Sequence, residues 1–170
     1  MARNFTVHGP FKLHPTKMKA NRHFEAANAA TFWADHPELV SRKGCYIFAM
    51  RAAKGSKPVY VGKATTGFGN EAFTGDKRDK LNRALANQKK GTPLVYFACL
   101  QTSKGKTNEQ AIDNAETFLI QVGRVANPQL LNKQKAKVET WSIAGIIRSP
   151  KGPRSTAAGH LRKCLKLDRA

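Results

Sequence analysis

The chain has 170 residues, of which 41% are hydrophobic and 24% are charged. This length and composition predict one folded domain with a sizeable core, and they exclude an intrinsically disordered chain. Thirty lysines and arginines against eleven acidic residues give a formal net charge of +19, which favours an acidic partner, most often a nucleic acid. No apolar run approaches the ~20 residues of a membrane-spanning helix. The first residues lack the apolar core of a signal peptide, so we expect no membrane partner.

The three cysteines are widely spaced and never form a C-x-x-C pair. An odd number without this spacing argues against a disulfide scaffold and against a thiolate zinc site. Cys45 and Cys99 lie in apolar stretches, so we expect buried free thiols and a reducing, cytoplasmic compartment.

The first part of the chain predicts an arm, a helix and a β-hairpin. Residues 1–22 carry prolines and a glycine without periodicity, and we expect them to form an extended arm. An Ala-rich helix is expected over 24–33, ending before Pro37. Residues 44–50 and 59–62 are rich in aromatic and β-branched residues and predict two short strands, which pair across a turn-like segment.

A polar loop leads into the second part, where helices alternate with one strand. Leucines and alanines at helical spacing predict a helix over 76–89, and a third strand is expected over 93–100. The spacing of Thr107 and Gln110 is that of a capping box, so we expect a long helix to begin there and to end before Asn127. A further helix closes the chain. This order of elements predicts an α+β fold, with helices packed on a small, mainly antiparallel sheet.

Two tyrosines are expected on one face of the hairpin. Side chains alternate between the faces of a strand, so if Phe48 pairs with Tyr60, then Tyr46 lies opposite Gly62. Both hydroxyls then emerge on one side, and the glycine leaves an open space beside Tyr46. Ordinary aromatic packing explains the same residues.

One carboxylate falls inside the apolar arc of the long helix. On a helical wheel Glu116 lies between Ile112 and Ile120. An unpaired buried carboxylate is costly, so Glu116 needs a cation. That cation is either a nearby lysine or arginine, or a divalent metal such as Mg²⁺. Glu109 lies in the first turn of the helix, where the helix dipole is a sufficient explanation.

Lys77 and Arg78 occupy the first turn of the helix over 76–89, where positive charge opposes the helix dipole. Both border the buried face on the helical wheel, whereas Arg83 points into solvent. Arg78 could grip a phosphate with two parallel hydrogen bonds. The alternative is a solvated run of charge.

Taken in order, these features resemble a known nuclease family. Gly44-Cys45-Tyr46, followed by Tyr60-Val61-Gly62 and then Lys63, resembles the two halves of the GIY-YIG signature. A basic helix, the helix that carries Glu116 and the segment Asn-Pro-x-Leu-Leu-Asn ending at Asn132 follow in the family's order.

The resemblance implies a core over 44–132 with a three-stranded antiparallel sheet and flanking helices. An N-terminal arm and helix at 1–43 precede this core, and a basic C-terminal extension at 133–170 follows it, with its helix over 156–167. The implied function is a metal-dependent DNA endonuclease that hydrolyses phosphodiester bonds. DNA is the implied partner and Mg²⁺ or Mn²⁺ the implied cofactor, without a small-molecule cofactor, and homo-oligomerisation is left open.

By resemblance, Tyr46 would be the general base or would orient the attacking water, and Tyr60 would hold the scissile phosphate. Glu116 would ligate a single divalent ion. Arg78 would neutralise the charge on the reacting phosphorus, assisted by Lys63. The candidate catalytic residues are therefore Tyr46, Tyr60, Lys63, Arg78, Glu116 and Asn132.

Two departures from the family pattern keep a second function open. Extra residues before the basic helix loosen the alignment of Arg78, so that Lys77 and Lys80 are rivals, and Asn82 stands where many members carry a histidine. The alternative is a non-catalytic nucleic-acid-binding protein on a degenerate domain; a basic structural protein, such as a ribosome-associated factor, is a third. The C-terminal extension carries a net charge of +8 and is the expected grip on nucleic acid. The expected nucleic-acid contacts are Lys77, Lys80, Lys104, Lys106, Arg148, Arg162, Lys163 and Lys166.

Overall fold

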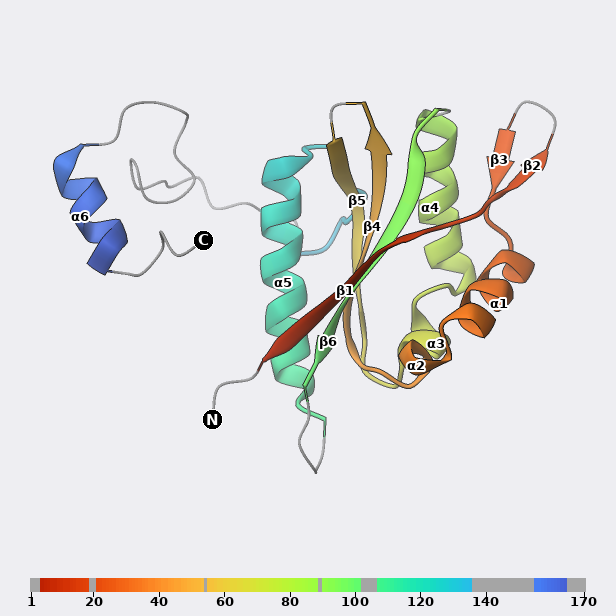
Figure 1. Cartoon of the computed structure of the whole chain (residues 1–170), viewed down its shortest axis with the longest axis horizontal. Helices are drawn as coiled ribbons and strands as arrows, with labels where there is room; N and C mark the ends of the chain where they lie inside the picture. Colours follow the sequence, from red (N-terminus) through yellow and green to blue (C-terminus); the bar gives the residue numbers. More distant parts are fainter. Residues whose placement is uncertain are drawn as a thin grey trace. The chain divides into compact units, whose positions relative to one another are not determined.

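The aromatic and β-branched residues after Gly44 form the hairpin at the centre of the fold. A computed structural model describes residues 4–18, 21–53, 55–88, 90–101, 107–135 and 155–164. The chain divides into two compact units, Met1–Lys137 and Val138–Ala170. In the second unit the described residues form the helix α6 (Thr156–Cys164), within the range expected from the sequence (Figure 1).

An antiparallel four-stranded sheet lies at the centre of the first unit, in the order β1-β6-β4-β5 (Figure 1). The strands are β1 (Phe5–Lys12), β4 (Gly44–Ala52), β5 (Gly55–Ala64) and β6 (Thr92–Leu100). The three predicted strands are therefore present, and the α+β fold is confirmed. The prediction of a three-stranded sheet is wrong, because part of the expected N-terminal arm pairs with β6 as a fourth strand.

The fourth strand was missed because its alternation is interrupted. The register of β1 against β6 shifts between His8 and Phe11, where Gly9 and Pro10 lie. Gly9 has a φ of 112°, a conformation that favours glycine. Proline and glycine are typical of loops, and they hide the strand pattern from the sequence.

The hairpin has the register that the prediction for Tyr46 took as its condition. Tyr46 pairs with Gly62, and Phe48 pairs with Tyr60. Both strands are longer than expected, since β4 continues to Ala52 and β5 begins at Gly55. The segment expected as a turn is therefore largely paired.

Helices cover both faces of the sheet, and the strand alternation decides which side chains face which helix. On one face Tyr46, Phe48 and Phe97 pack in a large core with residues of α1, α3 and α4. On the other face Cys45 and Val61 pack near α5. The helices of this unit are α1 (Ala26–Asp35), α2 (Pro37–Val40), α3 (Phe68–Glu71), α4 (Gly75–Asn87) and α5 (Glu109–Ala126), and a small second sheet pairs β2 (Thr16–Met18) with β3 (Asn21–His23).

Details of the helices differ from the predictions. The side chain of Asn108, and not Thr107, caps α5 by accepting a 2.9 Å hydrogen bond from the amide of Ala111. The predicted capping box is therefore wrong, and the Thr107 hydroxyl instead accepts a 2.9 Å hydrogen bond from Lys43 Nζ. The side chain of Val122 on α5 is exposed although it is apolar. The loop expected before α4 contains the short helix α3.

Cys45 and Cys99 are buried free thiols, as predicted. Burial raises the pKa of the Cys45 thiol to about 12, so it remains protonated near neutral pH. Within the described residues, no helix has the length and the apolar character needed to cross a bilayer.

Candidate functional site

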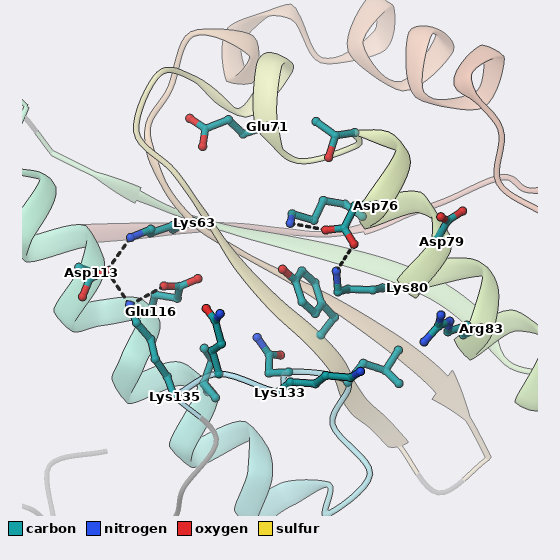
Figure 2. A pocket seen from close by; sticks show the side chains of 17 residues that line it. Lys63, Glu71, Asp76, Asp79, Lys80, Arg83, Asp113, Glu116, Lys133 and Lys135 are labelled. Carbon is teal, nitrogen blue, oxygen red and sulfur yellow. Dashed lines mark hydrogen bonds and ion pairs between the residues drawn. The ribbon is translucent and has the colours of Figure 1, made fainter.

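An open cleft of about 880 Å³ lies between α4 and α5, with the segment that follows α5 along one side (Figure 2). Tyr60, from β5, also lines the cleft. The cleft is lined by charged side chains of both signs. The cationic side chains are Lys63, Lys77, Lys80, Arg83, Lys133 and Lys135, and the acidic ones are Glu71, Asp76, Asp79, Asp113 and Glu116.

The cleft brings together most of the residues that the sequence singled out in the first unit. Tyr60 and Lys63 of β5, Glu116 of α5 and Asn132 all line it, together with the helix lysines Lys77 and Lys80. Tyr46 and Arg78 do not belong to its lining. The candidate site is therefore assembled from four segments that are far apart in the sequence.

Tyr60 presents its ring to two ammonium groups. Lys80 Nζ lies 5.1 Å from the ring centroid and Lys77 Nζ lies 5.8 Å from it, distances at which a cation interacts with an aromatic face. Burial raises the pKa of Tyr60, and the Lys77 ammonium offsets only part of that shift. The hydroxyl is therefore neutral near pH 7 and can donate a hydrogen bond to an anion.

Tyr46 lies in the core behind the cleft. Its side chain is fully buried between Phe48 and Phe68, and its hydroxyl donates a long hydrogen bond of 3.4 Å to the backbone carbonyl of Glu71. Burial raises its pKa above the usual value of 10. The open space predicted beside Gly62 is absent, because the Tyr46 ring itself covers the glycine.

Glu116 is held by a lysine. Its side chain is only 13% exposed, and its Oε2 lies 2.9 Å from Lys135 Nζ. The same ammonium lies 2.5 Å from Asp113 Oδ1, one turn earlier on α5, and Lys63 Nζ contacts that same oxygen at 2.5 Å (Figure 2). The ion pair that the sequence offered as one explanation of Glu116 is thus present.

These ion pairs shift the titration of their members. Hydrogen bonds from Lys135 and Lys63 lower the pKa of Asp113 to about 2. Burial alone would lower the pKa of Lys135, but its hydrogen bonds to Asp113 and Glu116 outweigh burial and leave the pKa raised. Both groups are therefore charged near neutral pH.

The other wall of the cleft is the cationic side of α4. Asp76 Oδ2 lies 2.6 Å from Lys77 Nζ, and Asp76 Oδ1 lies 2.5 Å from Lys80 Nζ. Hydrogen bonds from these two lysines lower the pKa of Asp76 to about 2. Arg83 lies further along the same helix and also lines the cleft.

The positions of Arg78 and Arg83 correct the helical-wheel prediction. Arg78 Nη1 donates a 2.7 Å hydrogen bond to the backbone carbonyl of Phe73, and Arg78 does not line the cleft, whereas Lys77 does. Arg83 is exposed, as expected, but its exposed side is the cleft. The wheel gave angles relative to Leu81 and could not show which flank of α4 another segment would face.

Asn132 binds the backbone of the hairpin. Its Oδ1 accepts a 2.9 Å hydrogen bond from the amide of Val61, and its Nδ2 donates a 2.8 Å hydrogen bond to the carbonyl of the same residue. Asn82 holds Phe24 in the same two-bond manner, with distances of 2.7 Å and 3.2 Å. Both amides are therefore committed to backbone groups. Asn132 fixes the strand that carries Tyr60, whereas Asn82 fixes the N-terminal segment.

Sequence reasoning missed Asp113 and Lys135. Asp113 lies three residues before Glu116, a spacing that puts the two on one face of a helix, and this signal was available. Lys135 gave no local signal, because it reaches α5 only after the chain reverses beyond Asn127. Glu71 was also missed; its Oε1 accepts hydrogen bonds from the amides of Thr65 and Thr66 at 2.7 Å and 2.6 Å and orders the loop before α3.

Several expected nucleic-acid contacts cannot be placed. Lys104, Lys106, Arg148 and Lys166 lie outside the described residues. Arg162 and Lys163 belong to α6, but their side chains also lie outside the described part. In the part of the chain that the structure covers, no group of three or more His, Cys, Asp or Glu side chains could hold a metal ion.

Comparison of the chain with models of protein families, with curated proteins and with solved structures found no match. The resemblance to the GIY-YIG nucleases therefore stays a prediction from the residues quoted above.

Proposed function

We propose that this protein is a metal-dependent DNA endonuclease that hydrolyses phosphodiester bonds in the cleft between α4 and α5. One observation carries the proposal: a mostly buried carboxylate, Glu116 of α5, lines one open cleft together with Tyr60 and a row of cations on α4 (Figure 2). The buried free thiols fit a reducing compartment, and we place the activity in the cytoplasm.

The cationic row on α4 suits a nucleic-acid backbone. Lys77, Lys80 and Arg83 are each three residues apart, and a helix rises 1.5 Å per residue, so neighbouring side chains start about 4.5 Å apart along the axis. Such a row can contact successive phosphates of one strand, which positions the strand without reading its bases. The neutral hydroxyl of Tyr60 adds a hydrogen-bond donor beside the row.

The acidic pair on α5 fits a divalent ion. Asp113 Oδ1 and Glu116 Oε2 both contact the single ammonium of Lys135, so two carboxylate oxygens converge on one cation position. Hard oxygen donors of this kind are the ligands that Mg²⁺ and Mn²⁺ take in proteins. A divalent ion bound there would stabilise negative charge on the reacting phosphate.

The side chains of the cleft then position the reacting phosphate and neutralise its negative charge. Phosphoryl transfer depends mainly on positioning and on charge stabilisation. Tyr60 orients the phosphate through its hydroxyl, and Arg83 takes the role expected of Arg78, whose guanidinium is engaged by Phe73. Tyr46 supports the wall that carries Tyr60, since its neutral, buried hydroxyl is unsuited to accept a proton.

A second candidate is a protein that binds nucleic acid without cutting it. The observation that favours it is that the ammonium groups of Lys63 and Lys135 together balance the charges of Asp113 and Glu116, so that neither carboxylate of this pair is unpaired. Such a cleft would bind phosphates through its cationic side chains alone.

Supercoiled plasmid separates the two candidates. The purified full chain is incubated with plasmid in Mg²⁺ or Mn²⁺ and, in parallel, in EDTA. The decisive variant is Glu116→Gln, which keeps the volume of the side chain but removes its charge. Glu109→Gln is the matched control, because Glu109 is exposed in the first turn of the same helix, away from the cleft.

If the protein is an endonuclease, we expect nicking that requires a divalent ion. This nicking should be lost in Glu116→Gln and retained in Glu109→Gln, while the wild type and both variants should shift DNA equally in a gel. A gel shift without nicking in either ion would favour the binding protein. A wild-type nicking rate in Glu116→Gln would show that the metal assignment is wrong or that the activity is a contaminant.

A further inference from the structure

Lys135 lies at the position where the two acidic side chains of α5 converge. Its Nζ contacts Glu116 Oε2 at 2.9 Å and Asp113 Oδ1 at 2.5 Å, and its side chain is 29% exposed. The neighbouring cations are placed differently. Lys63 contacts Asp113 without an ion pair to Glu116, and Lys133 lines the cleft without an ion pair to either carboxylate.

The backbone that precedes Lys135 is held in place by hydrogen bonds to strand β5. Three residues earlier, Asn132 is tied to Val61 by two hydrogen bonds. Between them the chain turns, and Lys135 has a φ of 56°, a left-handed conformation that residues other than glycine adopt at a cost. Because Lys135 is only three residues from Asn132, the backbone keeps the Lys135 ammonium near Asp113 and Glu116. The flexible lysine side chain still allows the ammonium to move away from them.

We propose that Lys135 is an internal competitor for the divalent ion: its ammonium occupies the position between Asp113 and Glu116 and must leave when the ion binds. This inference rests on the proposed function, because it takes the acidic pair as the metal site. The ammonium of Lys135 and a divalent ion repel each other and need the same two oxygens, Asp113 Oδ1 and Glu116 Oε2, so only one of them can occupy the position between these oxygens.

The competition makes metal binding weaker than the two carboxylates alone would allow. The apparent affinity of a site falls in proportion to the fraction of time for which it is free. If Lys135 holds the pair for nine-tenths of the time, its removal should tighten metal binding about tenfold. The release of Lys135 also couples metal loading to the segment that follows α5, which forms one side of the cleft.

Calorimetric titration of the intact protein with Mn²⁺ tests this without any assay of cleavage. Lys135→Met removes the ammonium and keeps most of the side-chain length. Lys133→Met is the matched control, because it removes the same charge from the same cleft two residues away. We expect Lys135→Met to bind Mn²⁺ about tenfold more tightly than the wild type, and Lys133→Met to change the affinity much less.

Chemical labelling of the wild-type protein gives a second readout that needs no variant at position 135. An amine-reactive ester is applied with and without Mn²⁺, and modification of each lysine is measured by mass spectrometry. Because coupling between two ligands is reciprocal, Mn²⁺ should increase the labelling of Lys135 while that of Lys133 stays unchanged. In Glu116→Gln the increase should disappear.

The outcomes distinguish this inference from the proposed function. Equal Mn²⁺ affinities for the wild type and Lys135→Met, together with loss of binding in Glu116→Gln, would overturn the competition and leave the metal site standing. If Lys135→Met and Lys133→Met both bind Mn²⁺ more tightly by the same factor, the loss of any positive charge in the cleft would explain the effect. This result would also overturn the competition by Lys135. Absence of Mn²⁺ binding in every protein would overturn both the competition and the metal-dependent nuclease.

Discussion

Replacing Gly62 by alanine should destabilise the first unit, because a Cβ at this position would enter the ring of Tyr46. That atom would lie 2.8 Å from Tyr46 Cε2 and closer still to Cζ and to the hydroxyl oxygen. Carbon atoms in favourable contact are about 3.5–4.0 Å apart. Either the ring or strand β5 must therefore move by a large part of an ångström or more.

The surroundings leave the ring little room to move. Tyr46 is fully buried, with its centroid 5.4 Å from that of Phe48 and 6.4 Å from that of Phe68. Overpacking of a filled core typically costs about 1–3 kcal/mol, and we expect the upper half of that range here. In a chain of this size each kcal/mol lowers the melting temperature by about 2–4 °C, so a loss of about 2–3 kcal/mol gives a fall of about 4–12 °C.

Thermal and urea unfolding followed by circular dichroism measure the effect. Gly75→Ala is the matched control, because a Cβ there meets no atom within 4 Å and alanine is the better helix former in α4. Tyr46→Leu removes the atoms that clash. Tyr46→Leu lowers stability by itself. When Tyr46 is already leucine, Gly62→Ala should cost much less than in the wild type, which corresponds to a coupling free energy of about 1–3 kcal/mol between the two sites. Equal costs of Gly62→Ala in both backgrounds would refute this account of the glycine.

Two further predictions concern the cleft. Asn132→Ala leaves the amide and the carbonyl of the buried Val61 without their partner, and should cost about 1–3 kcal/mol in urea unfolding; a wild-type unfolding curve would mean that water replaces the amide. The carboxyl groups of Asp76 and Asp113 have a pKa lowered from 3.8 to about 2 in the folded protein. Their contribution to stability is therefore present above about pH 4 and is lost as the pH falls towards about 2. Asp113→Asn should flatten the fall in the free energy of unfolding across this interval, and an unchanged slope would contradict the ion pairs.

Patterns that depend on neighbouring residues were predicted well from the sequence. With Phe48 taken as the partner of Tyr60, alternation placed Tyr46 opposite Gly62, and both pairs are present in the structure. Helical spacing placed Leu81 and Leu85 in the core and Glu116 inside the apolar arc of α5, where its side chain is only 13% exposed. In each case the period of the element alone decides which side a residue occupies.

Features that depend on distant segments were not predictable in this way. The pairing of β1 with β6 is hidden by Gly9 and Pro10, which interrupt the alternation. A helical wheel placed Arg83 away from the core but could not show that the cleft lies on that flank. The contact of Lys135 with Glu116 requires the return of the chain after α5, which no local pattern encodes.

The segment after α5 also covers the edge of the sheet that is formed by β5. Strand β5 is the last in its sheet, and an open edge strand offers a row of free donors and acceptors to another chain. Here the carbonyls of Pro58 and Val59 accept hydrogen bonds from Asn127 Nδ2 and from the amide of Leu131, and Asn132 engages both backbone groups of Val61. One segment therefore forms one side of the cleft and also covers this edge of the sheet. A variant that frees the segment should expose a surface for strand addition, and such a protein should aggregate as well as lose its binding site.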